Sequence, residues 1–332
     1  MQYNLDLHTH LPRKASPKKY WKYVVDNKLL GTAITEYANK NPKISYQQLL
    51  KYKPKNKILI PGVKIKSDSG EVIVYSPTPE IYDFSIIYEE NVSLNRLIDF
   101  CDKKNYLIVI AHPFGLISNS ASYIVGLNKL EKLVKEKNVG VEAYTGTIGY
   151  LSYYLYDSFF LRKLRQLMNY LELNRMVNAL GLSRFPEYLT KKLDQKSYDI
   201  VYRFGAAIEL GNKAKYITAG SGSENIERIG SGILTLDLPK DVCEKENVNE
   251  IILNKIKLKE VVSVGPPGTF KEELFERSTN RITKLKAYDD LVYITHKELQ
   301  KPKREKKQTT KQEPKKEREK RMIATITKDF IE

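Results

Sequence analysis

The feature that most constrains the fold is an alternation of short apolar runs with amphipathic stretches through much of the first 235 residues. A short apolar run that leads into a polar or glycine-marked turn is typical of a buried strand, and an amphipathic stretch is typical of a helix that covers a sheet. The alternation therefore predicts repeated βα units around parallel strands. We expect the strands at residues 2–8, immediately before residues 34–37, and at 57–65, 71–75, 106–113, 139–144 and 215–220.

Two helices can be located from their start signals and spacing. Pro17 follows Ser16 at the first helical position, and apolar residues continue at helical spacing to Leu29, so we expect a helix that ends at Gly31. A second helical pattern covers residues 248–256.

Residues 147–203 interrupt the βα rhythm and are predicted to form a helical insertion. One face of the pattern is apolar and the opposite face is mostly basic, with Leu161, Leu164, Met168 and Leu171 on the first and Arg162, Lys163, Arg165 and Gln166 on the second. Two interpretations stay open: a packed helix with a solvated face, or a basic lid that grips a substrate.

The C-terminal part differs in composition. The GPPGTF segment at 265–270 lacks the lysine and the spacing of a phosphate-binding loop, so it is interpreted as a turn. Residues 299–322 are nearly free of apolar side chains and cannot offset their ordering entropy by burial, which predicts a disordered tail. We therefore expect a barrel domain at 1–298, insertion included, and a tail at 299–332. Residues 301–321 hold eleven Lys or Arg against four Glu, a net charge of +7, which fits either nonspecific phosphate binding or a solubilising extension.

The formal charge of +16 and the pI of about 9.4 predict attraction to polyanions. Nucleic acid, a phosphorylated metabolite or an acidic protein would all satisfy this charge. No apolar run approaches the roughly 20 residues that a spanning helix needs, and the first residues lack the pattern of a signal peptide, so we expect a cytoplasmic protein without membrane association. The two cysteines, Cys101 and Cys243, lie far apart and indicate neither a disulfide framework nor a cysteine zinc site.

Three of the four histidines lie at expected strand ends: His8, His10 and His112. Residues two apart in an extended segment point the same way, so His8 and His10 can present imidazole nitrogens to one cation. His112 follows an apolar run and precedes Pro113, which would place it at the same rim. An isolated HxH pair often satisfies core hydrogen bonds instead, and the third histidine favours a site.

Six short motifs follow one another between residues 4 and 235: DLHTH at 6–10, GTAITEY at 31–37, IPGVKI at 60–65, IAHPFG at 110–115, VEAY at 141–144 and AGSGSE at 219–224. Their order resembles that of the polymerase and histidinol phosphatase (PHP) family, whose members show HxH, TDH, PGVE, AHP and GSDAH in succession. The resemblance implies a distorted (β/α)7 barrel that binds up to three divalent metals and hydrolyses phosphate esters, including nucleotide or nucleic-acid phosphodiesters.

His8, His10 and His112 match ligand positions of the family unchanged. Other positions depart from the pattern: Tyr37 replaces the histidine of TDH while Glu36 keeps a carboxylate, and Lys64 replaces the glutamate of PGVE. At the GSDAH position, the segment from Gly220 through Ser221, Gly222 and Ser223 to Glu224 lacks the aspartate and ends on glutamate.

A lysine beside a cation adds repulsion, so we expect fewer than three ions, of Zn, Mn or Fe. The open arrangements are one metal on His8, His10 and His112 with Glu142 or Glu224, no metal, or a rearranged cluster that uses Glu36 and Glu224. Lys64 could be carbamylated, could bind a phosphate as a point charge, or could form a salt bridge with Glu36, Glu142 or Glu224.

These observations lead to three hypotheses. The first is a metal-dependent phosphoesterase in which His8, His10, His112 and Glu142 hold the metal, while Glu36, Lys64 and Glu224 serve catalysis on a phosphomonoester or a nucleic-acid phosphodiester. The second is a PHP-like protein without activity that binds nucleic acid or a phosphorylated partner through its basic surface and tail. The third is a scaffold subunit whose insertion and tail dock other proteins.

Overall fold

The computed structural model describes residues 1–12, 15–115, 119–149, 166, 202–203, 205–222 and 224–266. The chain divides into two units, Met1–Lys286 and Ala287–Glu332, and all the described residues belong to the first. Most of the predicted insertion at 147–203, most of the GPPGTF turn and the whole tail therefore lie outside the described residues.

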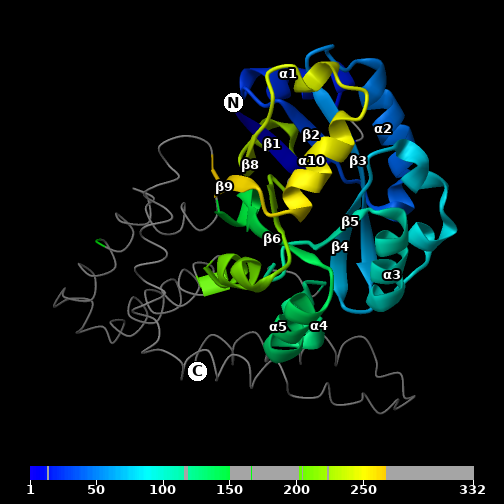
Figure 1. Cartoon of the computed structure of the whole chain (residues 1–332), viewed down its shortest axis with the longest axis vertical. Coiled ribbons are helices and arrows are strands. Elements are labelled where there is room, and N and C mark those ends of the chain that lie inside the picture. Colours follow the sequence, from blue (N-terminus) through cyan, green and yellow to red (C-terminus); the bar gives the residue numbers. More distant parts are fainter. Residues whose placement is uncertain are drawn as a thin grey trace, which may run out of the picture. The chain divides into compact units, whose positions relative to one another are not determined.

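The strands of the described residues form one sheet in the order β7-β6-β5-β4-β3-β2-β1-β8-β9 (Figure 1). Their bounds are β1 Gln2–Thr9, β2 Gly31–Ile34, β3 Ile58–Ser67, β4 Gly70–Tyr75, β5 Leu107–Ile110, β6 Gly140–Thr145, β7 Ile217–Gly220, β8 Ile233–Asp237 and β9 Val261–Gly265. The sheet curves into a nearly closed barrel, because the backbone N–H of Gly222, just beyond β7, donates to the carbonyl of His8 in β1 at 2.9 Å.

The seven expected strands are present as β1–β7, while β8 and β9 were not predicted. The sheet is mixed rather than parallel throughout. β1, β2 and β3 run parallel, as do β5, β6 and β7, but β4 is antiparallel to both β3 and β5, and β8 is antiparallel to β1 and β9. The physical reason at β4 is the connection: Asp68 and Ser69 alone separate β3 from β4, and a parallel crossover needs a dozen residues or more.

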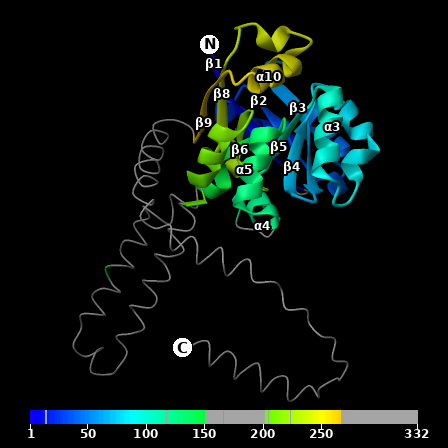
Figure 2. The same ribbon diagram turned by 60° about the horizontal axis from the view of Figure 1, so that its bottom comes forward.

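The helices with described bounds are α1 Pro17–Asp26, α2 Pro42–Lys51, α3 Leu94–Lys104, α4 Ala121–Val125, α5 Leu127–Glu136 and α10 Val248–Lys257, with short 3₁₀ turns at Ala38–Lys40, Pro79–Asp83, Ser85–Tyr88, Ile226–Arg228 and Val242–Glu244. Residues 146–149, 166, 202–203 and 205–213 are helical as well. Helices α1, α2, α3 and α5 pack on the outer face of the curved sheet (Figures 1 and 2). The expected end of the first helix at Gly31 was wrong. The helix ends at Asp26, Lys28 turns the chain with a φ of 54°, and Gly31 already begins β2.

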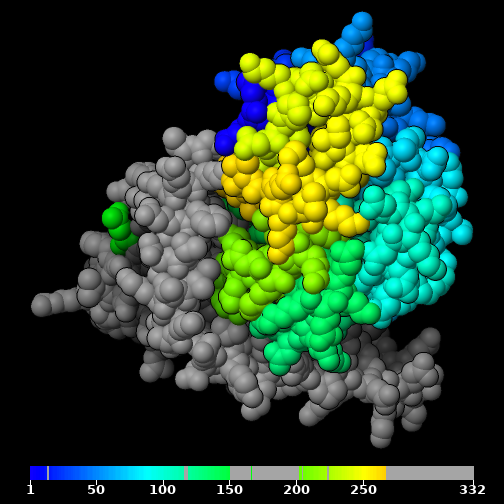
Figure 3. Space-filling view, in the orientation of Figure 1, coloured from blue at the N-terminus to red at the C-terminus, as the bar shows by residue number. Residues whose placement is uncertain are grey.

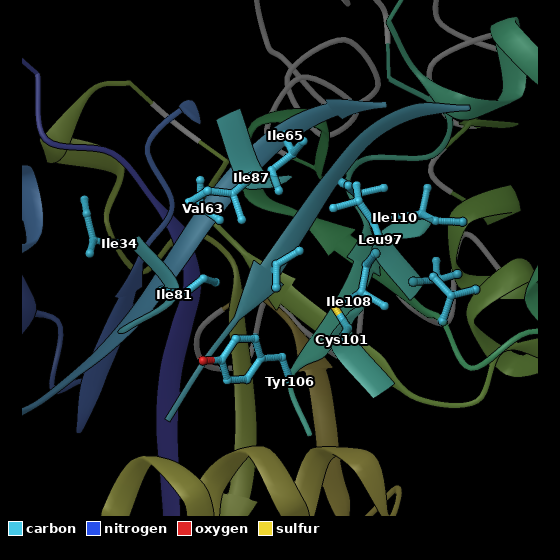
Figure 4. Packing of buried hydrophobic residues seen from close by; sticks show 14 of the residues in the cluster. Ile34, Val63, Ile65, Ile81, Ile87, Leu97, Cys101, Tyr106, Ile108 and Ile110 are labelled. Atoms are coloured by element: carbon cyan, nitrogen blue, oxygen red, sulfur yellow. The ribbon is translucent and has the colours of Figure 1, made fainter. Parts of the chain in front are cut away.

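Two apolar clusters hold the sheet and helices together. The outer one packs strand residues such as Val63, Ile65 and Ile108 against Leu97 and Cys101 of α3 (Figure 4). The inner one fills the barrel with alternate residues of the same strands, including Leu5, Ile60, Ile73, Tyr75 and Val109. Both sheet faces are therefore buried, as the nearly continuous apolar strands require.

α10 adds Ile252, Leu253 and Ile256 to the inner cluster. The side-chain amide of Asn249 donates to the carbonyls of Leu59 and Pro77, which places the helix near the start of β3 and the end of β4. At the end of α10, the Lys257 ammonium donates to the side-chain oxygen of Asn105, just after α3, at 2.8 Å. The yellow part of the chain borders the cyan part on the face seen in Figure 3. Apolar packing thus fills the barrel where the parallel strands begin.

Within the described part of the chain, every helix is too short or too polar to cross a membrane.

Candidate functional site

Buried polar side chains gather at the opposite end of the barrel, where the parallel strands finish. His8 and His10 lie at the end of β1, Lys64 in the second half of β3, His112 just after β5, and Glu142 in β6. All five are at least nine-tenths buried. The strand ends of a barrel meet at one rim, so residues far apart in sequence come together here.

A register irregularity in β1 directs His8 into this cluster. The pairing of β1 with β2 shifts between Asp6 and Thr9, so Leu7 can join the inner apolar cluster while the adjacent His8 also faces the barrel. Such bulges often re-aim a side chain beside a functional site. The ring of His8 lies 5.3 Å from that of His10 and 5.8 Å from that of His112, measured between centroids. The three imidazoles expected to share a rim are therefore neighbours.

His8 is held in one orientation. Its Nδ1 lies 2.7 Å from Oε1 of Glu142, so Nδ1 carries the proton and donates it to the carboxylate. Burial, with the charge of Lys64 nearby, lowers the pKa of His8 well below its usual value of 6.5, so the ring is neutral. Its buried Nε2 has no hydrogen-bond partner among the described residues. A neutral imidazole whose Nδ1–H is held by a carboxylate, with a free Nε2 lone pair, has the arrangement found in metal-binding histidines.

Glu142 also fixes His112. Its Oε2 accepts the backbone N–H of His112 at 2.7 Å. That residue has a φ of 28°, in the left-handed region that L side chains rarely adopt, and such strain persists where surrounding contacts enforce it. Burial raises the pKa of Glu142, although the His112 contacts and Lys64 act to lower it.

Lys64 forms a buried ion pair with Glu71, at the start of β4. Its Nζ lies 2.8 Å from Oε2 of Glu71 and 2.9 Å from Nε2 of His112. Burial acts to lower the pKa of Lys64, but the Glu71 carboxylate and Tyr37 outweigh it and raise this pKa. Burial likewise acts to raise the pKa of Glu71, yet His112 and Lys64 hold it far below the usual range. Both groups are therefore charged, and the expected alternatives Glu36, Glu142 and Glu224 are not the partner of Lys64.

Glu71 was missed in the sequence because its place depends on the antiparallel turn. In the β3–β4 pairing Glu71 lies opposite Lys66, one diagonal step from Lys64 on the same face. The short Asp68–Ser69 connection was the available signal, since it forces the start of β4 back to the rim where β3 ends.

Glu36 and Tyr37 complete the side of the cluster next to His10. Oε1 of Glu36 accepts the backbone N–H of Leu11 at 2.5 Å, and its Oε2 lies 3.5 Å from Nδ1 of His10. The Tyr37 ring stacks on His10 with 5.8 Å between centroids, and the Lys64 ammonium lies 4.7 Å from the ring centre. Tyr37 thus fills space beside His10.

Glu224 lies outside this cluster. Its side chain is 70% exposed and pairs with Lys40 at 3.2 Å, in contact with none of the three histidines. The adjacent backbone instead closes the barrel: Ser221 N–H donates to Asp6, and Ser221 Oγ to the carbonyl of His8. Burial raises the pKa of Asp6 to about 7. Hydrogen bonds from the backbone N–H groups of Gly230, Ser221 and His8 act in the opposite direction and lower this pKa.

The buried charges favour a cation over an anion. Lys64 contributes one positive charge, while Glu36, Glu71 and Glu142 contribute three negative ones, so the cluster has a net charge of −2 when the imidazoles are neutral. Lys64 is already neutralised by Glu71, which leaves no free positive side chain among these residues for a phosphate group.

As the side chains stand, no group of three or more His, Cys, Asp or Glu in the described ranges has an arrangement that could hold a metal ion. The contacts of His112 explain this. Its Nε2 is engaged by the Lys64–Glu71 pair in either tautomer, accepting from Lys64 or donating to Glu71, whose Oε2 lies 3.2 Å away. Its Nδ1 is buried and has no hydrogen-bond partner among the described residues.

Fold and site together define a mixed α/β protein with a nearly closed, barrel-like sheet and a buried histidine–carboxylate cluster at one rim. No family model matches the sequence, and no curated protein sequence matches it. Among solved structures the chain is similar to PsfC from Pseudomonas syringae PB-5123, with a TM-score of 0.47 and 14% identity over 86% of this chain and 99% of that one. Neither value defines a family, so the residues of the site carry the functional argument.

Proposed function

We propose that the chain is a divergent PHP-type phosphoesterase that uses one divalent metal ion at the rim of a distorted (β/α)7-like barrel. The observation that carries the proposal is His8: its Nδ1–H is committed to Glu142, and its neutral, buried Nε2 lone pair has no partner in the described structure. An unsatisfied buried acceptor costs about 1–3 kcal/mol, so its presence supports a ligand that accepts the lone pair.

The spacing of two rings supports a single ion at His8. Imidazoles that share one tetrahedral ion at about 2.1 Å place their ring centroids roughly 5 Å apart. The measured separation of 5.3 Å between His8 and His10 is close to this value. His8 and His10 would hold the ion, beside His112, whose Nε2 is already engaged. Glu142 would orient His8 rather than bind metal itself, since both of its oxygens are occupied.

A bound divalent ion would supply a nucleophilic hydroxide at neutral pH and would polarise a phosphoryl oxygen. The net charge of the cluster supports a cation at this position, and the ordered PHP-like motifs support phosphate esters as the substrate class. The ligand types suit Zn, Mn or Fe.

The test compares wild type with Glu142→Gln and Glu224→Gln. A glutamine at 142 has one acceptor oxygen, so it cannot accept both the His112 backbone N–H and the His8 Nδ1–H. If the oxygen keeps His112, the NH2 end faces His8, and the His8 proton must move to Nε2, which removes the metal-binding lone pair. We expect a 10- to 100-fold loss of Zn²⁺ affinity, roughly the effect of losing such an orienting carboxylate. Hydrolysis of p-nitrophenyl phosphate and of its bis ester should fall in parallel.

Glu224→Gln is the matched control, because it makes the same change at an exposed carboxylate outside the cluster. It should leave metal affinity and hydrolysis within about twofold, since an exposed pair contributes little. Hydrolysis by wild type that persists unchanged in chelator, or that is absent at saturating Zn²⁺, Mn²⁺ and Fe²⁺, would contradict the proposal.

A second candidate, binding of nucleic acid or another phosphorylated partner without catalysis, is supported by the charge of +16. The histidine cluster is net negative, so the basic surface and tail would carry this binding rather than the barrel rim.

A further inference from the structure

The Lys64 side chain ends inside the histidine cluster rather than at its edge. Its Nζ lies 2.8 Å from Glu71 Oε2, 2.9 Å from His112 Nε2 and 4.7 Å from the centre of the Tyr37 ring, and its side chain is 5% exposed. A carboxylate, an imidazole nitrogen and the face of an aromatic ring all attract cations. One ammonium group therefore occupies a position built to surround a positive charge.

Glu71 is itself fixed on its other side. Its Oε1 lies 3.3 Å from the side-chain amide of Asn119 and 3.5 Å from the Tyr37 hydroxyl. Its Oε2 is left to face Lys64 and His112. The carboxylate thus keeps one oxygen in the cluster.

We infer that the Lys64 ammonium takes the place of a metal ion between Glu71 Oε2 and His112 Nε2. By occupying this position, Lys64 limits the cluster to one exchangeable metal ion. The inference rests on the proposed metal site at His8. Carboxylate oxygen and imidazole nitrogen are both metal ligands, and two like charges a few ångströms apart repel strongly in a buried site. A metal ion and the ammonium cannot share this position.

The consequence is a latent second metal site. Removing the charge of Lys64 frees Glu71 Oε2 and His112 Nε2 at the same time, and these two atoms are already 3.2 Å apart. A neutral side chain at position 64 should therefore allow one more ion to bind.

The experiment counts Zn²⁺ bound to the full chain after equilibrium dialysis, in wild type, Lys64→Met, Lys64→Gln and Lys66→Met. Lys66 is the matched control, because it lies two residues away on the same strand, carries the same charge and is exposed. Both neutral variants at position 64 should bind one Zn²⁺ more than wild type and Lys66→Met. Lys64→Met with Glu71→Gln should lose that gain, because the carboxylate ligand is removed.

Equal Zn²⁺ content in wild type and both folded position-64 variants would overturn the inference. Glutamine keeps a hydrogen-bond donor for Glu71, so Lys64→Gln guards against unfolding caused by a buried unpaired carboxylate. Both neutral variants could unfold without metal. In that case, the inference is supported if Zn²⁺ refolds them but does not refold the double variant with Glu71→Gln. It is contradicted if Zn²⁺ does not refold them.

The same counts separate this inference from the proposed function. If wild type and every variant bind one ion, the metal-dependent function is supported and the role of Lys64 is contradicted. If wild type binds no ion but the position-64 variants bind one, the role of Lys64 is supported and the metal-dependent function is contradicted.

Discussion

Glu142 links two histidines that lie 104 residues apart in the chain, and this one carboxylate decides the chemistry available at the rim. It sets the tautomer of His8 and holds the backbone of His112 in its left-handed conformation. From the sequence, Glu142 was expected to be a metal ligand; the structure commits both of its oxygens to positioning instead. Its metal-ligand role stays a prediction that the observed contacts do not favour.

The lowered pKa of His8 predicts a stability change below pH 6.5. In the unfolded chain His8 takes up a proton at its ordinary pKa of 6.5, whereas in the folded chain it does so only at lower pH. The unfolded state then binds more protons, so the free energy of unfolding should fall as the pH drops below 6.5, by about 1.4 kcal/mol per pH unit from this residue. Above pH 6.5 this contribution is fully present.

The measurement is urea unfolding between pH 7.5 and 5.0 in wild type and His8→Asn. Asparagine keeps a donor for Glu142 but has no titrating group, so it should remove this part of the slope. Asp6, whose pKa is raised to about 7, contributes with the opposite sign in both proteins and cancels in the difference. Parallel curves for the two proteins would show that His8 titrates normally in the folded state.

At the scale of elements, the site depends on how closely β7 and the turn after it approach β1. Gly220 has no side chain, and a Cβ there would lie 2.3 Å from the backbone nitrogen of His8 and 2.4 Å from its Cβ. Ser221 and Gly222 then bond to the His8 carbonyl. The absence of a side chain at 220 is therefore what lets the barrel nearly close beside His8.

Gly220→Ala should push β7 away from β1, with an overpacking cost of about 1–3 kcal/mol in the free energy of unfolding. It should also weaken Zn²⁺ binding, because His8 moves with the displaced backbone. Gly126→Ala is the control: Gly126 has a φ of 78° with nothing within 4 Å of the added Cβ, so alanine there adds backbone strain without a clash. The control should lose stability yet keep its Zn²⁺ affinity. Equal Zn²⁺ affinity in both variants would contradict the proposed coupling between strand closure and the site.

At the scale of the whole molecule, the sequence predicted what local pattern determines. The strands β1–β7 and the meeting of His8, His10 and His112 followed from apolar runs and strand ends. The antiparallel direction of β4 could not be predicted from these local patterns. Glu71 was missed for the same reason, because its role depends on a diagonal contact between β3 and β4. The strands β8 and β9 were also missed. β8 pairs with β1 across more than 200 residues, and such a pairing leaves no local signal.

The charge of the whole chain leads to a last prediction, for the second candidate function. Deleting residues 299–332 removes the segment with a net charge of +7 at 301–321, while every described strand and helix is retained. If the tail binds phosphates, affinity for single-stranded DNA should fall, and the slope of log K against log salt concentration should become shallower by about 0.7 for each lost contact. Thermal unfolding of the barrel and hydrolysis of p-nitrophenyl phosphate should be unchanged. Replacing the lysines and arginines of 301–321 by glutamine at constant length is the control for chain length, and it should reproduce the loss of DNA binding. Unchanged affinity and slope in both variants would exclude the tail as a polyanion-binding segment and leave the solubilising interpretation.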